Sequence, residues 1–351
     1  MPLLQLRGRR LSASALATSR HRATAYTVGP NKWSAPLRTG LLATAVLATS
    51  AVLIRHRARQ AEYKHPPTGT FLEVDGLRLH YLERGKGTPV VLLHGNGVMA
   101  RDFEASGLVE RLSPRYRVLA FDRPGFGYSA RPRGRLWTPE AQAMLLHHAW
   151  EQLGIELPLI VGHSWGTLVA LALALNPAVA VRGLVLLSGY FFPTARADVP
   201  VMAVPALPGV GDVMRYTVSP LLGRLTGPRL IRKMFAPRPV PASFPAAMPL
   251  ALMLRPWQIR ASAEDTAFMI PAAAAFQPRY PELVLPVTIM AGANDQVIDG
   301  RRQSAQLHGT LPQSTLRVLP GVGHMLHYAV PEQVVEVIDA VTSTCHRIPM
   351  T

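Results

Sequence analysis

The pentapeptide GHSWG at residues 162–166 constrains the fold of this chain more than any other segment. An apolar run at 157–161 precedes it and has the length of a buried strand, and a helix-forming run at 167–175 follows it. A strand, a G-x-S-x-G turn and a helix in this order are typical of a nucleophile elbow, a turn so sharp that both glycine positions must be small. We therefore expect Ser164 to lie exposed beside a helix N-terminus, with the backbone N–H of Trp165 directed to where an oxyanion would form.

Segments of strand and helix character alternate along most of the chain. Strands are expected at 71–74, 77–82, 89–93, 116–121, 157–161, 181–187, 287–291 and 315–319, and helices at 103–112, 139–153, 301–311 and 332–341. This alternation predicts an α/β fold with a mostly parallel sheet covered by helices on both faces. Between 193 and 285 it gives way to a stretch rich in Pro, Ala, Met and Leu, which indicates short helices broken by prolines. The predicted organisation is a core of residues 62–192 and 286–351 with a helical cap, or lid, inserted at 193–285.

The N-terminal arm, residues 1–61, differs in composition from the rest of the chain. The chain has 37 Lys and Arg against 21 Asp and Glu, a net charge of +16. The arm contains ten of these basic residues and no acidic residue, which leaves residues 62–351 with a net charge of +6. That charge is ordinary for a globular domain. The basic excess therefore belongs to the arm, and we expect no nucleic-acid partner.

Within the arm, residues 39–54 form an uncharged, largely apolar run between Arg38 and Arg55. The run is shorter than the roughly 20 residues that span a bilayer comfortably. Basic residues at both ends favour a membrane anchor, and hence a membrane location. An organelle transit peptide, a wrongly assigned start and a disordered tail with a surface helix are the alternatives. The distribution of basic residues leaves the side of the membrane open.

Ser164 needs a base to take its proton, and the base needs an acid to orient it. In a fold with this elbow, the acid and then the histidine follow the serine along the chain. Asp295 comes directly after a predicted strand, and His324 lies in a glycine-flanked loop after the next strand. These two residues are the predicted acid and base. Asp198 is the alternative acid, and His327 is the alternative base.

A second donor for an oxyanion is expected from the loop at 94–97, His-Gly-Asn-Gly, which follows a predicted strand. The backbone N–H of Asn96 is the predicted donor, together with that of Trp165. His163, inside the elbow, is expected to pack or to position its neighbours, because the turn fixes its place. The loop at 122–125, Asp-Arg-Pro-Gly, is expected to brace the site.

Cofactor and metal chemistry have little support in the sequence. Cys345 is the only cysteine, which excludes an intramolecular disulfide and a zinc site built from several cysteines. The chain also has no G-x-x-x-x-G-K-[ST] phosphate-binding loop. We expect neither a cofactor nor a metal.

Taken together, these motifs resemble the α/β-hydrolase superfamily, in the broad group that carries a cap domain. The resemblance covers about residues 70–345 and rests on five segments: HGNG at 94–97, DRPGFG at 122–127, GHSWG at 162–166, GANDQV at 292–297 and GVGHM at 321–325. It implies the fold and a Ser-Asp-His triad. HGN with G-H-x-W-G is also similar to haloalkane dehalogenases and epoxide hydrolases, which carry aspartate where this chain has Ser164. That departure favours attack on a carbonyl carbon.

The predicted activity is that of a membrane-tethered serine hydrolase that cleaves an ester through an acyl-enzyme. The apolar lid suggests a small-molecule or lipid-like ester as the substrate. The alternatives are a carbon–carbon bond, thioester or amide hydrolase of the same fold, a dehalogenase- or epoxide-hydrolase-like enzyme, and a non-catalytic binder on the same scaffold. The oligomeric state stays open.

Overall fold

The computed structural model describes residues 35–345, and these residues form one eight-stranded sheet with helices around it. The strands, in chain order, are β1 (Thr70–Val74), β2 (Leu77–Arg84), β3 (Thr88–Leu93), β4 (Tyr116–Phe121), β5 (Leu159–His163), β6 (Gly183–Leu187), β7 (Val287–Gly292) and β8 (Thr315–Leu319). Their order across the sheet is β1-β2-β4-β3-β5-β6-β7-β8. Pairing is antiparallel at β1–β2 and β2–β4 and parallel elsewhere, which confirms the predicted mostly parallel α/β sheet.

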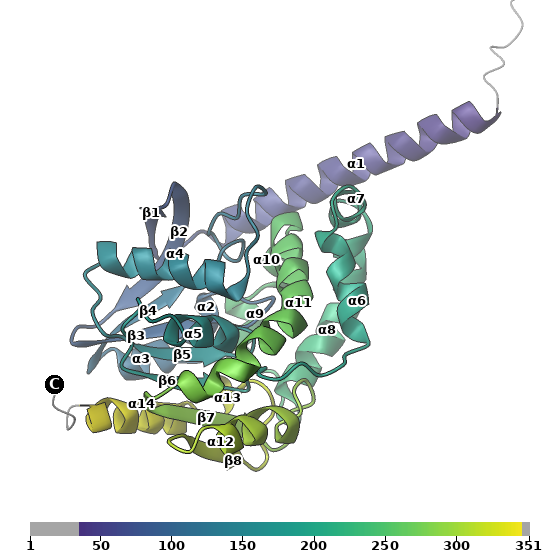
Figure 1. Cartoon of the computed structure of the whole chain (residues 1–351). Coiled ribbons are helices and arrows are strands. Elements are labelled where there is room, and N and C mark those ends of the chain that lie inside the picture. The colour runs from purple at the N-terminus through teal and green to yellow at the C-terminus, as the bar shows by residue number, and fades with distance from the viewer. Residues whose placement is uncertain (1–34, 346–351) are drawn as a thin grey trace, which may run out of the picture. The chain divides into compact units, whose positions relative to one another are not determined.

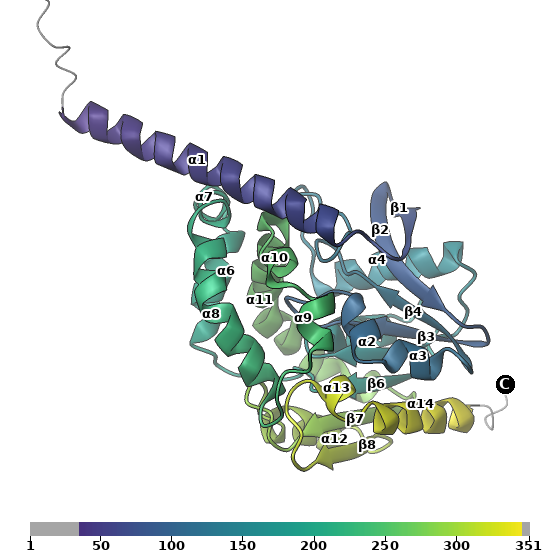
Figure 2. The same cartoon turned by 180° about the vertical axis from the view of Figure 1, so that it is seen from behind.

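Helices cover both faces of this sheet, as predicted. α4 (Pro139–Gln152) and α5 (Gly166–Ala174) lie on the face toward the viewer in Figure 1. α2 (Arg101–Ala105), α3 (Leu108–Leu112) and α14 (Pro331–Cys345) lie on the opposite face, which Figure 2 shows in front. Each face has its own buried apolar cluster. Because strands β3 to β7 are buried on both sides, their sequences are almost continuously apolar.

Two of the predicted helices differ in detail from the structure. The helix expected at 103–112 is divided into α2 and α3, because Gly107 adopts a left-handed φ of 74° between them. The helix expected at 301–311 begins as a π-helical turn, Arg301–Ala305, and continues as α12 (Gln306–Thr310). The last helical turns before α14 form α13 (Leu326–Ala329).

The segment between β6 and β7 is helical, and we call residues 193–285 the cap segment. Its helices are α6 (Asp198–Ala203), α7 (Val210–Arg215), α8 (Val218–Phe235), α9 (Ser243–Ala247), α10 (Leu250–Met253) and α11 (Pro256–Phe276), with two short 3-10 helices at Val204–Ala206 and Gln277–Glu282. The expectation that prolines keep these helices short is wrong for α8 and α11, which run through Pro228 and Pro271. A proline removes one backbone hydrogen bond, and tertiary packing can outweigh that cost.

The apolar run of the arm lies within α1 (Ala35–Lys64), a helix much longer than the run itself. The chain divides at Thr44 into two compact units, and the part of α1 from Ala45 onward belongs to the same unit as the sheet. In that part, Ala58 and Ala61 are buried, and Glu62 pairs with Arg255 of the cap segment. The arm's residues 1–34 lie outside the described part of the chain.

Candidate active site

Ser164 occupies a strained turn between β5 and α5. Its φ is 52°, a left-handed value that is costly for any residue with a side chain. A Cβ on Gly162 would lie 2.9 Å from the Gly166 carbonyl oxygen, and a Cβ on Gly166 would lie 2.2 Å from the Leu93 carbonyl oxygen. These contacts confirm the steric reason for glycine at both positions. The turn leaves Ser164 partly exposed at the carboxyl end of the sheet, where sites form in open α/β folds.

Asp295 and His324 form a buried pair at the ends of β7 and β8. The Nδ1 atom of His324 lies 2.8 Å from Oδ2 of Asp295. The other carboxylate oxygen accepts hydrogen bonds from the backbone N–H groups of Val297 and Ile298, at 2.7 and 3.0 Å. Burial alone would raise the pKa of Asp295, but His324 and these two N–H groups hold it below its usual value. The carboxylate is therefore ionised at neutral pH and can fix the orientation of the imidazole.

The cap segment holds the His324 loop directly. The backbone N–H of His324 donates to the carbonyl oxygen of Met234, at 3.1 Å, near the end of α8. A Cβ on Gly323 would fall 1.9 Å from the carbonyl oxygen of Ala236, so only glycine fits there. The position of the predicted base thus depends on the end of α8 as well as on the sheet.

The two predicted oxyanion donors are both free to bind a ligand. Among residues 35–345, neither the backbone N–H of Asn96 nor that of Trp165 has a hydrogen-bond partner. A Cβ on Gly95 would approach Cβ of Ser164 to 3.1 Å, which places the 94–97 loop against the elbow. The Asn96 side chain is tied to α11, because Nδ2 donates to the Ser262 carbonyl oxygen and to Thr266 Oγ1.

Arg123 braces the loops around Ser164, a role that the sequence suggested only for its loop as a whole. Its guanidinium donates to the carbonyl oxygens of His94 and Gly95, at 2.9 and 3.0 Å. It lies 4.5 Å from the Trp165 ring centroid, and it pairs with Asp265 of α11 at 2.6 Å, where both side chains are fully buried. The Trp165 indole N–H donates to the Asp265 carbonyl oxygen. One buried ion pair therefore connects the elbow, the 94–97 loop and the cap segment.

Removing the Asp265 carboxylate should destabilise the whole protein. We expect Asp265→Ala to lower the free energy of unfolding by about 3–5 kcal/mol, because the buried Arg123 cation would lose its ionic partner. Urea unfolding followed by circular dichroism measures this loss. Glu282→Ala removes a carboxylate from an exposed pair with Arg279 and should change the stability by under about 1 kcal/mol. Equal effects of the two variants would contradict the bracing role.

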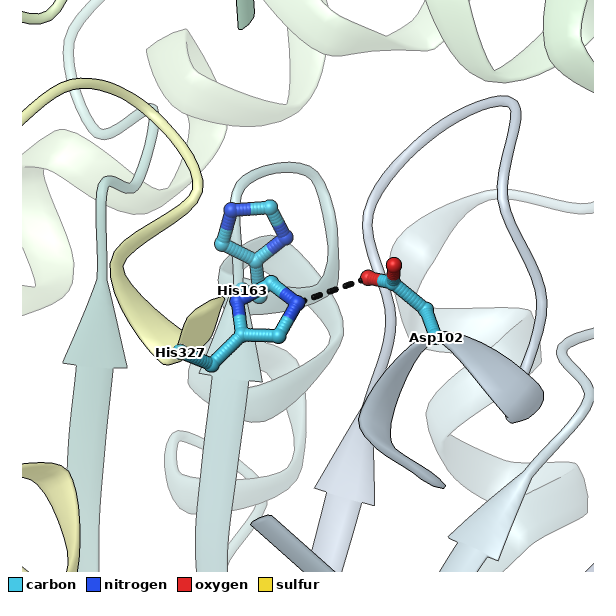
Figure 3. A group of neighbouring side chains, drawn as sticks. All are labelled: Asp102, His163 and His327. Carbon is cyan, nitrogen blue, oxygen red and sulfur yellow. Dashed lines mark hydrogen bonds and ion pairs between the residues drawn. The ribbon is translucent and has the colours of Figure 1, made fainter. Parts of the chain in front are cut away.

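A second histidine–aspartate pair lies behind the first. His327 Nε2 lies 2.8 Å from Asp102 Oδ2, and the Tyr328 hydroxyl donates to the other oxygen of Asp102. The ring of His163 contacts that of His324 in a tilted arrangement and that of His327 edge-on, with ring centroids 5.0 and 4.6 Å apart. Figure 3 shows His163 and His327 together beside Asp102. No local sequence pattern marks Asp102 as a site residue, because its partner lies 225 residues away.

His163 is neutral and contacts the backbone of the predicted base. Burial, followed by the nearby His327 and His324, lowers the pKa of His163 well below its usual value. Its Nε2 lies 3.1 Å from the His324 carbonyl oxygen and must therefore carry the proton. The ligand atoms of Asp102, His163 and His327 lie within 4.8 Å of one another. Since His327 and Asp102 are already hydrogen-bonded to each other, we interpret the group as a network that positions the His324 loop.

The alternative acid and base pair with other residues. Asp198 is exposed and pairs with Arg196 at 2.7 Å. His327 pairs with Asp102 and not with Asp295. The geometry therefore pairs Asp295 with His324, on the loops beside Ser164, and gives each alternative a different partner.

Comparison with known proteins identifies the architecture. A family model described as the alpha/beta hydrolase fold matches residues 88–329. Haloalkane dehalogenase 2 of Mycobacterium tuberculosis (strain ATCC 25618 / H37Rv) is 28% identical over 272 residues, 74% of this chain and 90% of that protein. The 2-hydroxymuconate semialdehyde hydrolase of Pseudomonas putida is 36% identical over 138 residues, 38% of this chain and 48% of that protein. The crystal structure of a bacterial membrane phospholipase A has a TM-score of 0.61 at 21% identity, covering 89% of this chain and 96% of that one.

Proposed function

The chain belongs to the α/β-hydrolase family, and within it we propose a serine hydrolase that cleaves an ester through an acyl-enzyme. The observation that carries the proposal is the buried Asp295–His324 pair on the loops next to the strained Ser164 turn. Substrate would be a small-molecule or lipid-like ester, and no cofactor takes part in the proposed steps.

The proposed mechanism assigns each group one task. Nδ1 of His324 is committed to Asp295, so Nε2 takes the proton as Ser164 Oγ attacks the carbonyl carbon. The backbone N–H groups of Asn96 and Trp165 bind the oxyanion of the tetrahedral intermediate. His324 then returns the proton to the leaving alcohol. Water, activated by the same histidine, attacks the acyl-enzyme, releases the acid and restores Ser164.

The serine itself argues against dehalogenation, although one relative is a haloalkane dehalogenase. A carboxylate that displaces a halide from an alkyl carbon forms an ester, which water can hydrolyse. A serine alkoxide in the same reaction would form an ether, which would not turn over. Attack on a carbonyl carbon avoids this dead end, because the acyl-serine is itself an ester.

Carbon–carbon bond hydrolysis is the second candidate, and one observation favours it. The relative named for 2-hydroxymuconate semialdehyde hydrolysis is 36% identical, although over less than half of its own length. The same serine and oxyanion donors would act on an aldehyde or ketone carbonyl in such a reaction. Ester and ketone substrates therefore need to be compared directly.

Two assays test the proposed chemistry. Wild-type protein should be labelled by an active-site-directed fluorophosphonate and should hydrolyse p-nitrophenyl esters, with chain length revealing the acyl preference. A vinylogous 1,5-diketo acid, assayed in parallel, represents carbon–carbon cleavage. Turnover of the diketo acid alone would replace the ester proposal with the second candidate. Absence of fluorophosphonate labelling would leave the chain as a binder on a hydrolase scaffold.

We also propose that α1 attaches the protein to a membrane. Leu37–Lys64 is long and apolar enough to cross a bilayer, with a mean hydropathy of 1.7 over its best window and 6% of that window buried. The helix extends beyond the apolar run at both ends, but the added turns carry Arg38, Arg55, Arg57 and Arg59, so the uncharged stretch is still residues 39–54. A span of this length requires the arginines at its ends to reach the headgroups. The last turns of α1 are buried at Ala58 and Ala61, so a deletion of the membrane segment has to end before these residues.

Fractionation tests this attachment. Full-length protein should stay in the membrane pellet after a carbonate wash, whereas a variant lacking residues 1–50 should become soluble. That deletion keeps the buried residues Ile54, Ala58 and Ala61. We expect similar turnover of a dissolved ester by both proteins, since α1 contributes no group to the proposed mechanism. Recovery of the full-length chain in the wash supernatant would refute the anchor.

A further inference from the structure

α8 exposes an apolar stripe in the cap segment. Val218, Leu221, Leu222 and Leu225 are spaced at i, i+3, i+4 and i+7, so they share one helix face. All four are exposed, Leu225 by 76%. α7 contacts α8 and exposes two more apolar side chains, Val210 and Val213. We call these six residues the cap surface. Exposed apolar side chains that gather in this way mark an interaction site.

Basic residues accompany the cap surface. α8 carries four exposed cations and no acidic residue: Arg224, Arg229, Arg232 and Lys233. The nearby part of α1 adds three more exposed arginines, Arg55, Arg57 and Arg59. Among residues 35–345, none of these seven side chains forms an ion pair or a hydrogen bond with another residue. Their charge is therefore available to an external anion.

The cap surface adjoins the helix that is proposed to enter the membrane. A shallow pocket between the two helices is lined by side chains from both, among them Ile54, Arg57, Ala58, Pro220, Leu221 and Arg224. The end of α1 is tied to the cap segment by the 2.7 Å pair between Glu62 and Arg255. Val52 and Leu53, just before the packed turns of α1, are themselves exposed and apolar. Apolar surface thus continues from α1 onto α8.

We propose that the cap surface docks on an anionic lipid bilayer, with its apolar stripe among the acyl chains and its arginines at the headgroups. An apolar stripe accompanied by cations is the pattern of a helix that lies in the membrane interface. A second copy of the chain is a weaker occupant, because self-association through this face would oppose like charges that have no acidic partners on α8. Attachment by α1 keeps the surface beside the lipid continuously.

Docking of the cap segment would also narrow the substrate class. The segment reaches the site directly, since Met234 at the end of α8 holds the His324 loop. An ester whose acyl chain is already in the bilayer would enter along the docked face without crossing water. This step rests on the proposed ester hydrolysis, whereas docking itself rests only on the surface and on α1.

Spin labelling of the full-length protein in vesicles tests docking without any reference to chemistry. A nitroxide at Leu225→Cys, in a Cys345→Ser background, should be accessible to oxygen and shielded from a water-soluble nickel complex. The matched control is a label at Val318→Cys, an exposed apolar position on β8, which should stay accessible to nickel. Vesicles of phosphatidylcholine with phosphatidylglycerol should give the shielding, and replacing Arg224, Arg229 and Arg232 with glutamine should weaken it.

Two label outcomes would overturn the proposal. Equal nickel accessibility at positions 225 and 318 would show that the surface lies in water. Shielding at position 225 in detergent micelles, together with dipolar broadening between labels, would assign the surface to a second copy of the chain.

Turnover measurements test the substrate class separately. The double variant Leu222→Ser/Leu225→Ser should lose roughly tenfold in turnover of a long-chain ester embedded in the vesicles, because it buries less apolar surface in lipid. Its turnover of a dissolved short-chain ester should match wild type, and Val318→Ser should be unchanged on both substrates. A parallel loss on both esters would refute delivery from the bilayer. Failure of wild type on every ester would instead refute the hydrolase proposal and leave the label results valid.

Discussion

Replacing Ser164 with alanine is expected to reduce ester turnover by on the order of 10³ or more, while the protein stays folded. The loss would arise because alanine has no hydroxyl to form the acyl-enzyme, although the oxyanion donors and His324 remain. Turnover of a p-nitrophenyl ester and far-ultraviolet circular dichroism, measured on the same preparation, check both parts. Activity close to wild type with an unchanged spectrum would remove Ser164 from the mechanism.

Ser188 provides a matched control for this substitution. It too directly follows a strand, β6, and has a left-handed φ of 46°, but unlike Ser164 it is buried. Its backbone N–H donates to Met290 in the same way that the Ser164 N–H donates to Leu187. Ser188→Ala therefore reproduces the backbone strain without removing the proposed nucleophile, and we expect it to retain most of the activity.

Replacing Asp295 with asparagine should lower turnover by on the order of 10³–10⁴. The amide cannot stabilise the imidazolium that forms when His324 takes the serine proton. It can also present an N–H to Nδ1, which favours the wrong tautomer of His324. Substrate binding should change little, so the loss should appear in kcat more than in KM when initial rates are measured across substrate concentrations.

Asp198→Asn is the control for this second substitution. Asp198 is exposed, and its pKa is lowered chiefly by a hydrogen bond from Arg196. Loss of an exposed ion pair costs under about 1 kcal/mol, so we expect nearly unchanged turnover. A severe loss at residue 198 together with a mild one at residue 295 would reverse the assignment of the acid.

Local sequence patterns predicted the sheet and most of the helices that cover it. The strands were recognisable because they are buried on both faces of the sheet and are therefore apolar. The Ser164 turn was predictable for a related reason, since steric demands at Gly162 and Gly166 appear directly as glycine. The expectation that prolines would interrupt the helices of the cap segment was wrong for α8 and α11. α11 passes through Pro271 because its buried side chains and its contacts with the core stabilise it beyond one missing hydrogen bond.

Long-range electrostatic partners could not be read from the sequence. Arg123 and Asp265 are 142 residues apart, and Asp102 and His327 are 225 apart. Burial and pairing of these residues depend on tertiary packing: Arg123 meets Asp265 where the cap segment contacts the core, and Asp102 meets His327 where α2 contacts α13. The pairing of Asp295 with His324 was predictable because each lies in the loop after a strand and because the order of such residues is known for this fold.

The cap segment has two parts that differ in how they contact the core: α11 is bonded to it, and residues 198–230 are largely not. In α11, Asp265, Thr266 and Gln258 bond to the loops around Ser164. Exchanging this helix would leave the buried Arg123 without its ionic partner. Residues 198–230, by contrast, make few bonds to the core and end before Met234, which holds His324. Substitutions within residues 198–230 would therefore alter the surface of the cap segment without removing the bonds that hold the loops around Ser164. A chimera that exchanges only 198–230 with a relative should acquire a new substrate range and keep its fold.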